Sequence, residues 1–97
     1  MSVETEVREI VFEALRALNE ELPGDQQVEL SDQTLLFGGE STIDSLSLVS
    51  VIVDVETEVG TRFRPVALTD DRAMSREPSP FTSVGALVEY IVELLSE

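Results

Sequence analysis

Apolar residues recur at helical spacing along the first part of the chain. From Ser2 onward they fall three or four positions apart, and several of the positions between them are glutamate. This spacing gathers the apolar side chains on one face of an amphipathic helix, and serine is a common cap at a helix N-terminus. Pro23-Gly24 ends the pattern. The apolar face consists of Val3, Val7, Ile10, Val11, Ala14, Leu15 and Leu18.

A second helix is predicted over residues 45–59, although this stretch is rich in valine and isoleucine. β-Branched residues favour strands. A half-buried strand alternates apolar and polar residues, however, and that alternation fails at Val51-Ile52-Val53. The polar residues recur instead at steps of three and four, as on one side of a helix: Ser47, Ser50, Asp54 and Glu58.

Two further helices are predicted in the last third of the chain. Thr69 is expected to cap the short helix Asp70-Asp71-Arg72-Ala73-Met74, whose aspartates suit the positive end of the helix dipole. Thr82 or Ser83 caps a final helix. The apolar stripe of that helix is Val84, Leu87, Val88, Ile91 and Leu95.

Three connecting segments separate the predicted helices. Residues 75–81 contain two prolines and must form a loop, and Arg62-Phe63-Arg64-Pro65 is expected to be extended. Residues 20–43 are longer than the usual unstructured connection, so we expect an ordered loop over the bundle with a short turn after Ser31. Its apolar residues are Leu22, Val28, Leu30, Leu35, Leu36 and Phe37. The patterns together predict an all-α fold: a small four-helix bundle with three longer helices, one short helix and a long ordered loop between the first two helices.

The charge of the chain excludes several kinds of partner. The 97 residues include 20 acidic and 6 basic side chains, which gives a net charge of −14. A surface of this sign repels the phosphates of nucleic acids and anionic lipid headgroups, and it attracts basic protein surfaces. No apolar stretch approaches the roughly 18 residues of a membrane span, and Met1-Ser2-Val3-Glu4 has no signal-peptide character. We therefore expect one cytoplasmic domain over residues 1–97 that neither binds nucleic acid nor inserts into a membrane.

The absence of cysteine and histidine removes the commonest catalytic and metal-binding groups. Without them there is no disulfide, no thiolate zinc site and no imidazole base. Asp70, Asp71 and Glu77 do not have the spacing of a calcium-binding loop. We expect no catalytic residues and no metal ligands, and hence a protein that is not an enzyme.

One serine stands where a helix is predicted to begin. Ser45 follows a long loop that contains Gly38-Gly39, with Asp44 directly before it and Leu46 directly after it. At a helix N-terminus the hydroxyl is exposed, and the free N–H groups and the dipole favour a covalently attached phosphate. The carboxylate of Asp44 opposes this by repulsion. Because serine and aspartate are also ordinary helix caps, the residues alone leave a plain cap open.

Over essentially its whole length the chain resembles an acyl carrier protein. The features that carry the resemblance are the acidic composition, the predicted four helices, the long first loop, Asp44-Ser45-Leu46, and the stretch from Phe81-Thr82-Ser83-Val84 to Tyr90-Ile91. The resemblance implies that Ser45 bears 4′-phosphopantetheine, attached from coenzyme A by a phosphopantetheinyl transferase. A thioester carrier without cysteine must import its sulfur, which that arm supplies. Ser47 and Ser50 replace residues that are often acidic in fatty acid carriers, which favours a specialised pathway.

One face of the second predicted helix is expected to bind partners. Winding the helix at about 100° per residue places a wide apolar arc on one side. The arc contains Leu48, Val51, Ile52, Val55 and Val59, and the opposite face carries Leu46, Val49 and Val53 beside Asp54 and Glu56. Apolar residues rimmed by acids indicate a docking patch. The resemblance implies that this face meets enzymes with basic surfaces that load and transfer acyl groups.

Two alternatives remain open for this face and for the function. The first loop could fold over the apolar residues, or they could pair in a homodimer; we expect a monomer. The alternative function is a non-catalytic acidic adaptor that binds a basic protein without a prosthetic group. It requires every feature named above except an exposed Ser45.

Overall fold

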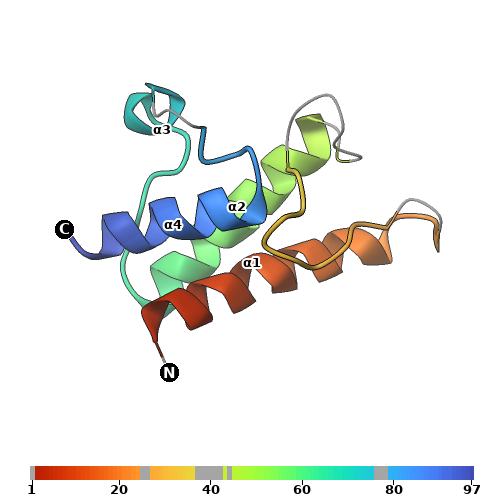
Figure 1. The fold of residues 1–97 in the computed structure, drawn as a ribbon, viewed down its shortest axis with the longest axis horizontal. Coiled ribbons are helices and arrows are strands. Elements are labelled where there is room, and N and C mark those ends of the chain that lie inside the picture. Colours follow the sequence, from red (N-terminus) through yellow and green to blue (C-terminus); the bar gives the residue numbers. More distant parts are fainter. Residues whose placement is uncertain (1, 25–26, 37–42, 44, 76–78) are drawn as a thin grey trace.

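The computed structural model describes residues 2–24, 27–36, 43, 45–75 and 79–97. They form four helices, α1 (Val3–Glu20), α2 (Ser45–Arg62), α3 (Asp71–Ser75) and α4 (Val84–Leu95), shown in Figure 1. Within those residues no strand forms, and β-type pairing is confined to a bridge between Leu35 and Ser83. The radius of gyration of 12.6 Å is close to the roughly 12.5 Å expected of one folded body of this length. The predicted all-α four-helix fold is confirmed.

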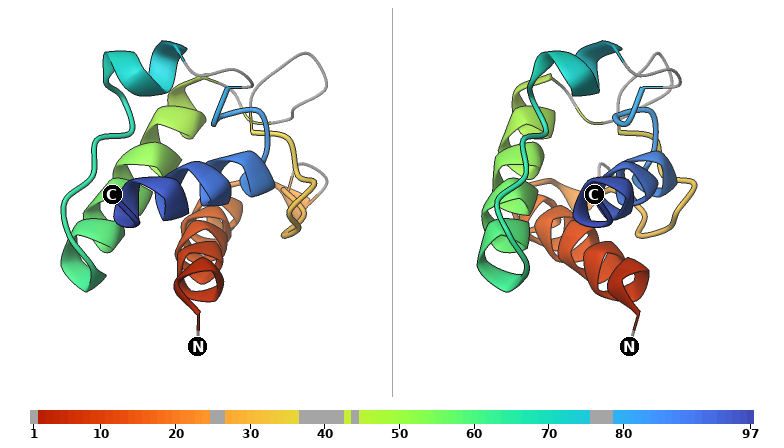
Figure 2. Two further views of the ribbon diagram at one scale, coloured as in Figure 1. Left: turned by 60° about the vertical axis from the view of Figure 1, so that its left-hand side comes forward. Right: turned by 90° about the vertical axis from the view of Figure 1, so that its left-hand side faces the viewer.

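Helix α1 is the central element of the bundle. It packs against both α2 and α4, and α4 lies across it in Figures 1 and 2. The start of α1 and the ends of α2 and α4 lie at one end of the molecule, whereas the start of α2 lies at the other end (Figure 1).

The core is built from the apolar stripes that the sequence predicts. The buried residues of the three longer helices are Val7, Ile10, Val11, Ala14, Leu15, Leu18, Leu48, Val51, Ile52, Val55, Val59, Val84, Leu87, Val88, Tyr90 and Ile91. The stripes fail only at their outer ends: Val3 is exposed and Leu95 is half-buried, because each lies in the terminal turn of its helix.

Two helices begin as the sequence predicts. Ser2 caps α1, since its side chain accepts a hydrogen bond from the backbone N–H of Thr5. Ser83 caps α4 in the same way, accepting from the N–H of Ala86. Each cap satisfies one of the donors that a helix start leaves without an intrahelical partner.

The predictions for α3 and for the end of α2 are wrong in detail. Asp70, not Thr69, caps α3, because its carboxylate accepts a hydrogen bond of 3.0 Å from the N–H of Ala73. Helix α2 continues to Arg62, a residue that the sequence places in an extended connector. An i,i+4 ion pair from Arg62 to Glu58, with Nε 2.7 Å from Oε2, stabilises this extra turn.

The long loop lies on the bundle, as predicted. Val28 and Leu36 are buried, and Leu22 and Leu30 are half-buried. Its start is fixed to α1 by Asn19, whose amide accepts from the N–H of Val28 and donates to the carbonyl of the same residue. The predicted turn after Ser31 is present, since the N–H of Thr34 donates to the Ser31 carbonyl. Phe37 and Gly38-Gly39 lie outside the described residues.

The second half of this loop is fastened to the start of α4. Backbone hydrogen bonds join Leu36 to Thr82, Thr34 to Val84 and Asp32 to Gly85. Asp32 also accepts a hydrogen bond of 2.7 Å from Nε of Arg8 on α1. The loop is thereby tied to two helices before the chain reaches α2.

Candidate functional site

Ser45 is the first residue of α2, as the sequence predicts. The preceding residue, Asp44, and residues 37–42 lie outside the part of the chain that the structure describes. Ile43 is buried, so the chain is anchored in the core two residues before the helix begins. This anchor fixes the start of α2 relative to the rest of the bundle.

The backbone at the start of α2 favours an anion, and the carboxylate of Asp44 directly before it opposes one. The first turn of the helix contains no acidic residue, and the basic residue of the helix, Arg62, lies in the last turn. The first backbone N–H groups of a helix have no intrahelical acceptor, and the helix dipole places partial positive charge there. A phosphate attached at this end would therefore be stabilised by backbone groups and not by an α2 side chain.

An exposed apolar face begins next to Ser45. Leu46 is 79% exposed, Val49 57% and Val53 49%. Among the described residues, the one other large apolar side chain that is exposed is Val3 on α1, at 42%. The predicted apolar arc of α2, from Leu48 to Val59, is buried, and the side chains of the opposite face are exposed to solvent, as predicted. Within the described part of the long loop, no residue covers Leu46 enough to bury it.

The two acidic residues assigned to this face have different surroundings. Asp54 is exposed and lines a shallow groove between α1 and α2 together with Glu13 and Glu58. Glu56 is half-buried, and its carboxylate accepts a hydrogen bond of 2.7 Å from the N–H of Leu68. Asp54 is open to a partner, whereas Glu56 has a structural role that the sequence pattern did not indicate.

A small apolar pocket opens beside this face of α2. It has a volume of about 140 Å³ and is lined by Leu48, Val49, Ile52, Thr69 and Phe81. Leu48, Val49 and Ile52 come from the first half of α2. Thr69 and Phe81 come from distant parts of the chain, and no local pattern in the sequence connects them to α2. Val49 therefore belongs to both the exposed face and the pocket wall.

Most of the arginines are held in ion pairs away from the start of α2. Arg8 pairs with Glu4 and Asp32, and the hydrogen bond to Asp32 is the main cause that raises the pKa of Arg8. At the other end of the chain, the hydrogen bond from Arg72 lowers the pKa of Glu97. Arg62 bridges Glu58 on α2 and Glu13 on α1.

Two negative findings hold for the residues that the structure describes. None of their acidic groups gather in threes in a way that could hold a metal ion. None of their helices combines the length and the apolar character needed to cross a membrane.

No protein-family model, no curated protein and no solved structure matches this chain.

Proposed function

We propose that this chain is a carrier protein that holds acyl intermediates on a 4′-phosphopantetheine arm attached to Ser45. The observation that supports the proposal most is the position of Ser45 as the first residue of α2, directly before an exposed apolar face. Asp44 and Leu46 flank the attachment point. The arm, when bound, supplies the thiol that forms the thioester, which a chain without cysteine cannot provide itself.

The proposed modification uses the Ser45 hydroxyl as the acceptor group. Its oxygen forms the new bond to phosphorus, the adenosine bisphosphate part of coenzyme A leaves, and the hydroxyl proton passes to the transferase. The chain's own contribution is placement: Ile43 anchors the approach to the helix, and the first N–H groups of α2 face the incoming phosphate. Because coenzyme A is a cytoplasmic donor, we propose a cytoplasmic protein.

The proposed partners are the transferase and the enzymes that load and remove the acyl group. Leu46, Val49 and Val53 offer an apolar contact area, and Asp54 offers a negative charge beside it. A partner with basic residues around an apolar patch complements this surface, and the net charge of −14 attracts it over a longer range. The apolar pocket beside Val49 has room for a few methylene groups of a carried chain.

A direct test is to incubate the protein with coenzyme A and a phosphopantetheinyl transferase of broad specificity. The molecular mass of the protein is then measured by mass spectrometry. We expect a mass gain of one phosphopantetheine group. Ser45→Ala should abolish the gain, and the matched control Ser50→Ala, an exposed serine on the same helix, should keep it. Circular dichroism should show the same helical content in all three proteins.

Two outcomes of this experiment contradict the proposal. An unmodified wild-type protein would favour the alternative, an acidic helical adaptor that binds a basic partner and carries nothing. A modified Ser45→Ala variant would move the attachment point to another serine. The adaptor uses the same α2 face, so binding to a basic protein alone does not separate the two functions.

A further inference from the structure

A shallow groove lies between α1 and α2. The two helices run side by side (Figure 2) and pack against each other. The groove has a volume of about 160 Å³. Ile10 and Ala14 of α1 line it and are buried, so they form its floor, and its rim is acidic, with Glu13, Asp54 and Glu58. The groove therefore combines an apolar base with negative charge at its edges.

One end of this groove already binds a guanidinium. Arg62, in the last turn of α2, bridges the two helices: its Nε lies 2.7 Å from Oε2 of Glu58, and its Nη2 lies 3.4 Å from Oε2 of Glu13. The bridge shows that carboxylates from α1 and α2 are spaced so that one guanidinium spans them. It also leaves the rest of the groove unfilled, because Arg62 lies at the end that Glu58 lines.

Asp54 extends the acidic rim one helical turn beyond Glu58. Its side chain is exposed, and no hydrogen bond or ion pair joins it to another residue that the structure describes. Glu13, on the facing helix, contacts Arg62 through one oxygen and is about half exposed. Within the described chain, the stretch of groove between Glu13 and Asp54 thus has two accessible carboxylates and no cation of its own.

The chemistry of the groove suits an arginine side chain better than other cations. The acidic groups of the described residues do not gather closely enough to hold a metal ion. A guanidinium is planar and has five N–H donors, so it can bind carboxylates on two helices at once, whereas the ammonium of lysine is a point charge. The methylene groups of arginine can cover apolar surface while the charged end stays at the rim, which matches the floor of Ile10 and Ala14.

We propose that the α1–α2 groove receives an arginine side chain of a partner protein, which bridges Glu13 and Asp54 in the way that Arg62 bridges Glu13 and Glu58. Asp54 directly follows Val53 of the exposed apolar face, so a protein that covers this face reaches the groove at its edge. The inference deepens the proposed function, on which it rests for the choice of partner, by extending the docking surface from α2 onto α1.

The test is an NMR titration of the whole chain with acetylarginine amide at neutral pH and low salt. Acetylcitrulline amide, which has nearly the same shape and no charge, is the control probe. We expect the arginine probe to shift the amide signals of Ala14 and Asp54 saturably. Asp70 and Asp71, which are exposed outside the groove, report on diffuse attraction by the net charge. Equal shifts at all four residues, or equal shifts with the citrulline probe, would overturn the proposal.

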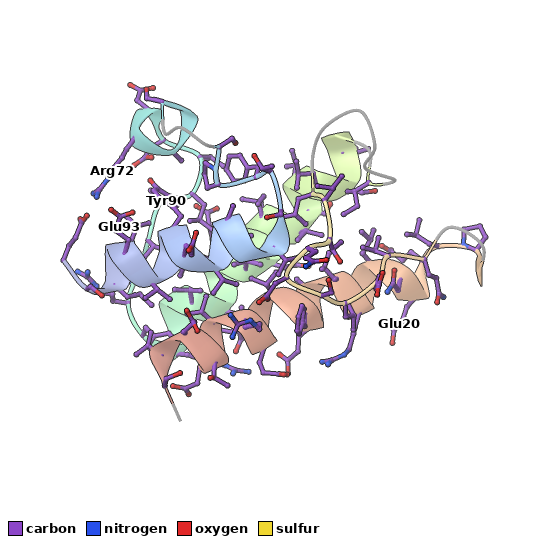
Figure 3. All side chains as sticks on the ribbon, viewed as in Figure 1. Glu20, Arg72, Tyr90 and Glu93 are labelled. Carbon is purple, nitrogen blue, oxygen red and sulfur yellow. The ribbon has the colours of Figure 1, made fainter. Side chains whose placement is uncertain are left out.

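The two rim carboxylates are then removed in turn. Glu13→Gln and Asp54→Asn should each weaken binding of the arginine probe by about two- to five-fold, as expected of an exposed ion pair. The matched control Glu20→Gln removes the same charge at the far end of α1 (Figure 3) and should leave the affinity unchanged. Unchanged affinity in both groove variants, or equal weakening by the control, would contradict the assigned site.

Removal of the internal guanidinium should have the opposite effect. Arg62→Gln leaves Glu58 without its partner, so the probe should bind about two- to five-fold more tightly, and the amide signal of Glu58 should now shift as well. Arg16→Gln, which removes an exposed arginine paired with Glu9 on α1, changes the net charge equally and should not tighten binding. Equal tightening by both variants would show that net charge alone attracts the probe.

These measurements are independent of the carrier function, because they need neither coenzyme A nor modification of Ser45. Binding of the arginine probe by a chain that no transferase modifies would refute the carrier and leave the groove in place. Modification of Ser45 in a chain whose groove does not bind the probe would refute the groove alone.

Discussion

Asn19 connects the long loop to α1 with both ends of its amide. Its Oδ1 accepts from the N–H of Val28 at 2.7 Å, and its Nδ2 donates to the carbonyl of Val28 at 2.9 Å. Both backbone groups are in a part-buried environment, so neither is easily satisfied by water after the amide is removed. The Asn19 side chain thus gives the backbone of Val28 the two hydrogen bonds that a neighbouring strand would give it in a β-sheet.

We predict that Asn19→Ala lowers the free energy of unfolding by about 2 kcal/mol, because an unsatisfied part-buried donor or acceptor typically costs 1–3 kcal/mol. The matched control is Gln27→Ala, which removes an exposed hydrogen bond to the carbonyl of Asn19 and should change stability by less than about 0.5 kcal/mol. Urea unfolding measures both values. If both variants lose the same small amount of unfolding free energy, water forms hydrogen bonds to the backbone of Val28 once the Asn19 amide is removed.

Helix caps show how far the sequence determines single-residue roles. The sequence predicts Thr82 or Ser83 as the cap of α4, and Ser83, directly before the apolar stripe, is the cap in the structure. At α3 the sequence offers Thr69 and Asp70 in succession, and both types are good caps. Asp70 is the cap in the structure, and Thr69 lines the apolar pocket instead. The choice depends on the path of the chain after Leu68, which is set by the core and not by local preference.

The cap assignment gives a second stability prediction. Ser83→Ala should destabilise the protein by about 1 kcal/mol, the usual effect of losing an N-cap side chain. Thr82→Ala, at the neighbouring exposed position that the sequence could not distinguish from Ser83, should be close to neutral. Thermal unfolding of the two variants under the same conditions separates them, and a larger effect at Thr82 would contradict the cap seen in the structure.

At the level of elements, the two faces of α2 were predictable and its end was not. The period of the apolar residues correctly separated the buried arc from Leu46, Val49 and Val53. The extra turn to Arg62 was missed because Gly60 weakens a helix and Pro65 follows closely. Tertiary contacts carry the helix through this point: Val59 is fully buried, and Arg62 pairs with Glu58 and with Glu13 on α1.

The exposed face of α2 is expected to tolerate substitutions that the buried face cannot. Val49→Glu should leave the melting temperature nearly unchanged, and it should slow modification of Ser45 or weaken binding to a basic partner. Val51→Glu, two residues along on the buried side, should lower stability by several kcal/mol because it buries a charge. Comparable destabilisation by both changes would show that Val49 is part of the core and that partners dock elsewhere.

Charge reversal on the same face should act through association kinetics. Asp54→Arg is expected to reduce the association rate with a basic partner, and added salt should shrink the difference from wild type, because screening weakens the steering. Its control is Glu20→Arg, an equal charge change at an exposed position at the end of α1. If both variants slow association equally, the effect comes from net charge and not from the α2 face.

At the scale of the whole molecule, the sequence predicted the helical bundle but not the apolar pocket. The bundle follows from periodic patterns within single helices. The pocket needs Thr69 and Phe81 to reach α2, and the ion pair of α3 needs Arg72 to reach Glu97. These contacts join residues that are far apart in the sequence. They depend on how the connecting segments fold back onto the helices, and no pattern within a short stretch of sequence indicates them. The position of Ser45 at the start of α2, beside an exposed apolar face, was predictable for the opposite reason, since a helix start and its faces are properties of one stretch of chain.

Net charge should make the stability of the fold rise with salt. Fourteen uncompensated negative charges on a domain of 97 residues repel one another, and the repulsion favours the expanded unfolded chain. Salt also weakens the arginine ion pairs, but these are exposed and few, so each contributes little. Screening the repulsion is therefore the larger effect.

We predict that raising sodium chloride from 20 to 200 mM increases the melting temperature, by about 4–8 °C for each kcal/mol of unfolding free energy gained. Magnesium chloride at the same ionic strength should raise it at least as much. A melting temperature that stays flat or falls would mean that the ion pairs outweigh the repulsion.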